Sequence, residues 1–325
     1  NTERRLENSA IKKFFIMENE NSSLPAAESK RNPAASYLSG LGSASSRTTL
    51  GHCLNQIAKT LGQDGYESAD WSKLKRCHWQ KVQNELKLRG CCGATINLYL
   101  NAFKAVAREA WSIDQLPQTA YLKIRSIKST QYERLPKGRS LSVTECRLLL
   151  EACADGSNQG ARDKAIFAVM MGCGLRRAEI VQLQMQDWDC LSRSFKFVGK
   201  GNKERQVFLP KSFDKCIDDW LIVRGLQSGV FFPRMRPGAN PNKFLFHHML
   251  PSSSYKILSK RADFAGLGKI RPHDLRRTFA TRMLEGGADV FLLQQAMGHS
   301  SAATTARYDY RSNDMRKKKC RSLLF

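Results

Sequence analysis

No hydrophobic run in the sequence approaches the roughly 18 residues that a membrane-spanning helix needs. The stretch 165–175 is short and contains glycines, so it predicts a helix buried in a protein core. Residues 11–16 are too short and too interrupted for a secretory hydrophobic region, which predicts no export. The chain begins at Asn1, and Met17, which is followed by a polar run, is a candidate natural start.

Cysteines at a metal-binding spacing are also missing. The ten cysteines are scattered, and only Cys91 and Cys92 are adjacent, so no C-x-x-C pattern occurs. The pair His247-His248 has no further Cys, His or carboxylate at a ligand spacing nearby. The sequence therefore predicts reduced thiols in a cytoplasmic protein and no bound metal.

Acidic residues are scarce relative to basic ones. The chain has 29 Asp and Glu against 53 Lys and Arg, which gives a formal net charge of +24. Such an excess favours a polyanionic partner, because neutralising phosphates releases counterions and so supplies affinity. Charge alone leaves two alternatives open, an acidic membrane surface and a generic basic protein with no polyanionic partner.

The 325 residues are enough for two domains of ordinary size. Residues 1–33 are polar and lack a sustained period, which predicts a disordered or mobile N-terminal arm. Apolar residues spaced by three and four predict four short amphipathic helices within residues 34–130. Residues 131–140 contain Pro136 and Gly138 and predict an exposed linker, so the second domain begins after it.

The second domain is predicted to mix helices with a small sheet. Ser142-Val-Thr-Glu145 is a capping box that starts a helix. Residues 194–200 and 204–209, joined by a Gly-Asn turn, predict a β-hairpin. Residues 229–252 contain four prolines and predict an irregular connection.

Polar motifs in this second half carry phosphate-binding and nucleophilic side chains. His273 and Arg276 are three residues apart, so on a helix that starts at Pro272 they project from one face and could touch one anion. The motifs, in chain order, are Gly174-Leu-Arg176-Arg-Ala-Glu179, Gly199-Lys200-Gly-Asn-Lys203-Glu-Arg205, His273-Asp-Leu-Arg276, and Met297-Gly298-His299-Ser300 with Tyr308 nine residues after His299.

In this order and spacing the motifs resemble those of the tyrosine recombinase or phage integrase family, which includes Xer- and Cre-like site-specific recombinases. The resemblance implies a mainly α fold with a small β-sheet. It implies a four-helix core-binding domain at residues 34–130, an α+β catalytic domain at residues 141–310 and a C-terminal tail, residues 311–325, that is exchanged between protomers. Two positions depart from the pattern, Arg277 where many members have histidine and Ala178 where serine is frequent.

The resemblance also implies a phosphodiester reaction that needs neither a metal nor another cofactor. Arg176 and Arg276 would hold the phosphate oxygens, with His299 as a further donor. Tyr308 would attack the phosphorus, and Tyr310 is a competing nucleophile.

Proton transfers are assigned to two further residues, again by resemblance. His273 is the candidate base, and Lys200 is the candidate acid for the 5′ oxygen, with Lys203 as its competitor. Glu179 would orient an arginine or histidine of the site without itself contacting the phosphate.

Other basic residues are predicted to contact DNA. For those in and around the second helix, a solvated charged face is the alternative interpretation. The candidates are Lys73, Lys75, Arg76, Lys81, Lys87, Arg89, Arg177, Lys203, Arg205 and Arg277.

The predicted function is site-specific DNA recombination, of the integration or excision type found in mobile elements, through a covalent 3′-phosphotyrosine and a Holliday junction. The expected partners are double-stranded DNA with specific recombination sites, three further copies in a homo-tetramer on DNA, and any accessory DNA-bending proteins. The expected location is the cytoplasm, at the nucleoid. Two alternatives stay open: type IB topoisomerase-like relaxation without synapsis, and a non-catalytic DNA-binding regulator.

Overall fold

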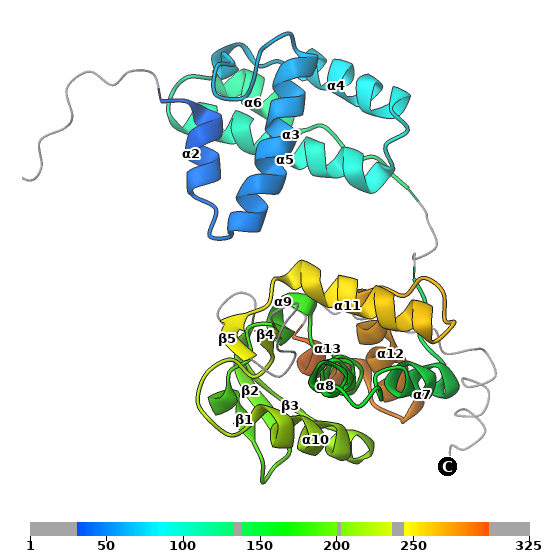
Figure 1. Cartoon of the computed structure of the whole chain (residues 1–325). Helices are drawn as coiled ribbons and strands as arrows, with labels where there is room; N and C mark the ends of the chain where they lie inside the picture. Colours follow the sequence, from blue (N-terminus) through cyan, green and yellow to red (C-terminus); the bar gives the residue numbers. More distant parts are fainter. Residues whose placement is uncertain (1–30, 133–137, 200–202, 236–243, 299–325) are drawn as a thin grey trace, which may run out of the picture. The chain divides into compact units, whose positions relative to one another are not determined.

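The chain forms two compact units, Asn1–Arg134 and Leu135–Phe325. A computed structural model describes residues 31–132, 138–199, 203–235 and 244–298 (Figure 1). The described part is mainly helical, as expected, and has two small antiparallel sheets where one was expected. Within it, no helix is both long enough and apolar enough to cross a membrane.

The first unit is a helical bundle built around its longest helix, α5. This helix packs against α2, α3, α4 and α6. Leu100, Phe103 and Val106 of α5 are buried, and the Phe103 ring lies 5.6 Å from the ring of Trp79 on α4. The five helices are α2 (Pro33–Ser39), α3 (Ala44–Thr60), α4 (Arg76–Leu88), α5 (Gly93–Ser112) and α6 (Gln118–Arg125), and a short 3-10 helix η2 (Trp71–Lys73) precedes α4.

The sequence prediction missed α2 and misplaced two side chains. Helix α2 starts where the Asn32 side chain accepts hydrogen bonds from the backbone N–H groups of Ala34 and Ala35, at the boundary that had been assigned to the polar arm. The apolar positions that predict α4 and α5 from the sequence include Leu88 and Leu98, and the spacing directs Leu98 inward, but both side chains are exposed. Leu98 lies outside the buried stripe of α5, and Leu88 is the last residue of α4.

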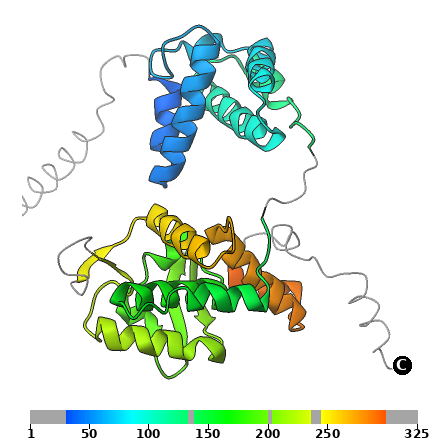
Figure 2. The same ribbon diagram turned by 45° about the vertical axis from the view of Figure 1, so that its right-hand side comes forward.

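The second unit is organised around α8 (Asn158–Gly172), which is buried along most of its length. Helices α10, α12, α11 and α7 pack on it, and Figure 2 shows it running between α11 and α10. The surrounding helices are α7 (Val143–Glu151), α9 (Arg177–Ile180), α10 (Asp214–Arg224), α11 (Pro251–Phe264), α12 (Pro272–Glu285) and α13 (Val290–Met297). The predicted core helix is therefore confirmed, and so is the capping box, because the Ser142 and Glu145 side chains each accept from the other's backbone N–H.

The predicted hairpin is confirmed, and the predicted irregular connection is wrong in part. Strands β1 (Trp188–Asp189), β2 (Ser194–Gly199) and β3 (Lys203–Phe208) form one antiparallel sheet in that order. In the supposed connection, β4 (Pro233–Met235) pairs with β5 (Phe244–His248). Prolines in the sequence concealed this second sheet because proline usually interrupts a strand, yet Pro233 is at the start of β4.

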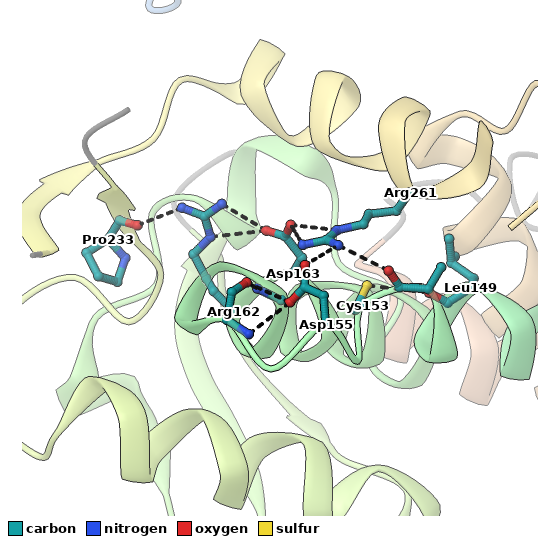
Figure 3. Close-up of polar contacts among 10 residues, drawn as sticks. Leu149, Cys153, Asp155, Arg162, Asp163, Pro233 and Arg261 are labelled. Atoms are coloured by element: carbon teal, nitrogen blue, oxygen red, sulfur yellow. Dashed lines mark hydrogen bonds and ion pairs between the residues drawn. The ribbon is translucent and has the colours of Figure 1, made fainter. Parts of the chain in front are cut away.

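A buried charge network joins four elements of the second unit (Figure 3). The carboxylate of Asp163 on α8 accepts from Arg162 Nη2 at 2.8 Å and from Arg261 Nε, on α11, at 3.1 Å. Arg261 also donates to Asp155 Oδ2 and to the carbonyl of Ala152, just after α7. The Asp163 and Arg162 side chains are both nearly fully buried, so Arg162 depends on this carboxylate for charge compensation, and Arg261 shares its charge between Asp163 and Asp155.

We expect Asp163→Asn to destabilise the protein by about 3–5 kcal/mol, because it leaves two largely buried guanidinium groups without their shared anion. The matched control is Glu151→Gln on α7, which breaks an exposed pair with Arg147 at 3.7 Å and should cost less than about 1 kcal/mol. Urea unfolding of the full chain, followed by circular dichroism, measures both changes. Equal shifts of the second unit's unfolding transition in the two variants would show that the buried network stabilises the unit no more than the exposed ion pair does.

Candidate functional site

The turn between α8 and α9 presents Arg176. Gly174 adopts a left-handed φ of +64°, and a Cβ atom there would collide with the Phe279 ring, so glycine is required on both counts. Arg176 is the N-cap of α9, and its backbone N–H donates to Glu179 Oε2 at 2.8 Å while its Nη1 donates to Oε1 at 2.7 Å. The carboxylate therefore fixes both the turn and the direction of the guanidinium.

Arg276 lies on α12, with only 1% of its surface exposed. Its guanidinium donates to the carbonyl of Gly174 and, from Nη2, to the carbonyl of Met297 at 2.7 Å. Gly174 lies just after the C-terminal end of α8, and Met297 is the last residue of α13. At such helix ends the helix dipole places partial negative charge. Arg276 thus connects three of the sequence motifs.

Arg176 reaches the same segment as Arg276. Its Nη2 donates to the carbonyl of Gly298 at 3.2 Å, one residue after the carbonyl that Arg276 binds. Two arginines that lie a hundred positions apart in the sequence therefore converge on consecutive peptide groups. That both arginines act on one anion stays a prediction, which this convergence makes physically reasonable.

His273 lies in the first turn of α12, after Pro272 at the first helical position. Part of its ring is exposed. The surrounding protein still displaces enough water to lower the pKa of His273, and the charges of Arg276, Arg277 and Arg176 lower it further. The imidazole is therefore biased toward its neutral form, which can accept a proton.

Gly298 ends α13 in the left-handed conformation, with φ of 61°. A Cβ atom there would lie 2.5 Å from Arg205 Nη1, so glycine is again needed for both conformation and space. The predicted residues His299 and Tyr308 follow it in the sequence. Like Lys200, they lie outside the described residues.

Arg205 on β3 has a different setting from the one the sequence suggested. It had been placed among the DNA-contacting residues, but its side chain is only 10% exposed and its Nη2 donates to Glu179 Oε2 at 2.6 Å. Its Nη1 donates to the carbonyl of Ala296 at 3.3 Å. Arg277 is also buried, so neither guanidinium lies on a free surface. The structure shows both side chains largely buried, and their assignment to DNA contact stays a prediction.

The other predicted DNA contacts fall into two groups. Arg177, at the start of α9, is exposed. Lys203 is the first residue of β3. The six basic residues in and around η2 and α4 of the first unit are all exposed: Lys73, Lys75, Arg76, Lys81, Lys87 and Arg89.

A groove of about 1230 Å³ opens beside the arginines. Its walls are β3, α12, α13 and the end of α8, and Arg176, Glu179, Arg205 and Gly298 line part of it. On the α13 wall, Phe291 is 73% exposed, so much of this groove is apolar and uncovered among the described residues.

The histidine pair 247–248 is not part of a metal site in the described portion of the chain, where no cluster of three metal-ligating side chains occurs. His248 instead contacts the Val181 carbonyl through Nδ1 at 2.8 Å and the Gln184 amide through Nε2 at 3.2 Å. These contacts connect β5 to the end of α9 and are structural.

Comparison with known proteins places the chain among recombinases. Residues 139–315, more than half of the chain, match the model of the phage integrase family. The tyrosine recombinase XerC of Chromohalobacter salexigens is 28% identical over 83% of this chain and 87% of its own length. XerC of Alcanivorax borkumensis is 30% identical, with coverage of 82% and 86%.

Solved structures agree on the fold. A lambda integrase fragment, crystallised as a dimer bound to a core site, superimposes with a TM-score of 0.63 at 12% identity, covering 85% of this chain and 94% of that one. At this identity the likeness establishes the fold alone, and the family match and the Xer relatives establish the class. The chain belongs to the phage integrase family and is a tyrosine site-specific recombinase.

Proposed function

We propose that the chain exchanges DNA strands at specific sites through a covalent 3′-phosphotyrosine formed by Tyr308. The observation that carries this proposal is the convergence of Arg176 and Arg276 on the carbonyls of Gly298 and Met297. His299 follows directly in the sequence, and Tyr308 nine residues later. The arginines are therefore held next to the segment that leads to the nucleophile.

The arginines supply the electrostatic part of the reaction. A phenol has a pKa near 10 and an imidazole one near 6.5, so moving the proton from tyrosine to histidine is uphill by roughly 5 kcal/mol. Arg176 and Arg276 offset this cost by stabilising negative charge on the phosphate oxygens and on the phenolate, and His299 adds a donor. Arg176 also pairs with Glu179, so its charge would be shared between that carboxylate and an incoming phosphate.

Proton transfer falls to His273 and Lys200. His273 is the base, since its lowered pKa keeps the ring neutral. Lys200, which lies between β2 and β3 in the sequence, protonates the leaving 5′ oxygen, with Lys203 as the alternative. No group in this scheme requires a metal or a nucleotide cofactor, because the phosphotyrosine conserves the energy of the phosphodiester bond.

The two units would divide the work on DNA. Residues 34–130 bind the duplex through the exposed basic side chains of η2 and α4, residues 131–140 connect, and residues 141–310 carry out the chemistry. Four copies assemble on paired sites in the cytoplasm, at the nucleoid, and exchange one pair of strands at a time through a Holliday junction. Accessory DNA-bending proteins complete the assembly where the site requires them.

We expect Tyr308→Phe to abolish covalent adduct formation and to leave DNA binding nearly unchanged, because the lost hydroxyl is a nucleophile and carries no charge. The probe is a library of end-labelled nicked duplexes of random sequence, first enriched for binding to the chain, and the adduct is read on a denaturing gel. Tyr310→Phe is the matched control and should form adduct normally. If Tyr308→Phe forms the adduct, Tyr310 is the nucleophile. If neither the wild-type chain nor either variant forms it, the chain is a non-catalytic DNA-binding regulator. If adduct forms but no recombinants appear between two sites, the activity is strand relaxation.

The pH profile of cleavage should report His273. A base must be unprotonated, so the single-turnover rate should rise with pH until the folded-state pKa is passed and then level off. Since that pKa is lowered, the acid limb should lie below the ordinary value of about 6.5. The limb should disappear in His273→Gln. An acid limb above 6.5, or one that persists in the variant, would assign the base elsewhere.

We further expect the C-terminal tail to bind the apolar groove of a neighbouring protomer. The described chain reaches the groove at Gly298, and the residues after it end in Leu323-Leu324-Phe325. Burying three such side chains would contribute roughly 4–8 kcal/mol before ordering costs. This is enough to link protomers on paired sites.

Removing residues 320–325 should leave single-site binding unchanged and weaken cooperative occupancy of paired sites, which gel-shift titration on one-site and two-site DNA measures. Phe291→Ser in the groove should have the same effect. Leu191→Ser, at a position 93% exposed on the turn after β1, is the matched control and should have none. Unchanged cooperativity in the truncated chain would mean that the tail links nothing.

A further inference from the structure

Arg205 makes contacts that a DNA-binding arginine would not need. Its guanidinium donates to Glu179 Oε2 at 2.6 Å and to the Ala296 carbonyl at 3.3 Å. Its Cζ atom lies 4.9 Å from the centre of the Phe197 ring, which belongs to the residue paired with it across the β2–β3 ladder. Burial lowers the pKa of Arg205, and the Glu179 charge offsets part of this shift.

A single carboxylate serves two arginines at this point. Glu179 Oε1 accepts from Arg176 Nη1, and Oε2 accepts from Arg205 Nη2. Burial by itself would raise the pKa of Glu179, but the hydrogen bond from the Arg176 backbone and the charge of Arg205 outweigh it, so the net pKa is lowered. The carboxylate is thus ionised, and its direction is set from both sides.

The second contact of Arg205 reaches the helix that precedes His299. Ala296 lies in the last turn of α13, next to the carbonyls that receive Arg276 and Arg176. Gly298 leaves just the space that Arg205 Nη1 occupies. Arg205 therefore connects β3, which begins three residues after Lys200 in the sequence, both to Glu179 and to α13.

We propose that Arg205 is a positioning residue for strand cleavage, which holds the Arg176 guanidinium in its productive direction through their shared carboxylate, Glu179, and fixes the β2–β3 hairpin against α13. This inference rests on the proposed cleavage function. Arg205 touches neither DNA nor the reacting atoms. Its charge and forked shape serve the protein's own geometry.

The test compares Arg205→Gln in two backgrounds. Single-turnover adduct formation is measured on the mapped cleavage site, with sulfur in place of the leaving 5′ oxygen so that slow variants remain measurable. In the wild-type background the rate should fall roughly 10- to 100-fold, as expected when a reacting group is misplaced by about 1 Å. In an Arg176→Lys background, where the fork to be positioned is already lost, the same change should cost less than about twofold.

DNA affinity provides a readout that separates positioning from phosphate contact. Arg205→Gln should leave the dependence of binding on salt unchanged, whereas loss of a phosphate contact would lower the slope by about one. Arg193→Gln is the matched control, because Arg193 also pairs with carboxylates, Asp214 and Asp218, but at the far end of β2. It should cleave at the wild-type rate.

Two results would overturn this inference and leave the proposed function standing. An equal loss of cleavage rate in both backgrounds would show that Arg205 has a general structural role. A reduced salt slope of DNA binding would show that Arg205 contacts DNA. Thermal unfolding of each variant identifies any that fail to fold. For such a case Arg205→Lys, which keeps the charge without the fork, is measured in the same two backgrounds and must show the same non-additivity. Absence of adduct from the wild-type chain on every enriched duplex would overturn the proposed function and this inference with it.

Discussion

A buried guanidinium between the ends of two helices is the interaction on which the second unit's site depends. Arg276 would be costly to bury without partners, since a charge removed from water must be compensated inside the protein. The partial negative charge at the ends of α8 and α13 provides that compensation through the carbonyls of Gly174 and Met297. When α12 packs against these two helix ends, the same packing therefore places Arg276.

This arrangement leaves the site with more positive than negative charge. Arg176, Arg276 and Arg277 all act on His273, and Asp274 is the acidic residue that opposes them there. Glu179 is divided between Arg176 and Arg205. A phosphate bound beside these arginines would add negative charge, and this electrostatic complementarity is the physical basis of the proposed cleavage.

Glycine is required where the motifs come closest together. At Gly174 and Gly298 the backbone is left-handed, and the space a side chain would need is taken by Phe279 or Arg205. These two residues flank the pair of arginines in space although they are far apart in the sequence. Arg205 lines the groove beside them and connects β3 to the Ala296 carbonyl of α13.

The sequence by itself determined the local features and the class of protein. The capping box at Ser142, the helix after Pro272 and the β2–β3 hairpin depend on neighbouring residues, so spacing alone predicts them. Motif order indicated the recombinase family before any contact was known. Helix α2 was missed because its cap, Asn32, lies at the end of a polar segment, and β4–β5 because prolines surround it.

Only the tertiary structure decided what each charge does. From the sequence, Arg205 was assigned to DNA contact because basic residues are usually solvated. Arg205 is two residues before the buried Val207 on β3, and side chains two apart on a strand share a face, so this spacing already placed Arg205 on the inner face. Glu179, the partner of Arg205, is 26 residues from it in the chain. Met297, the acceptor of Arg276, is 21 residues from that arginine. Whether a charged side chain is buried and compensated depends on such distant partners, and no local pattern contains that information.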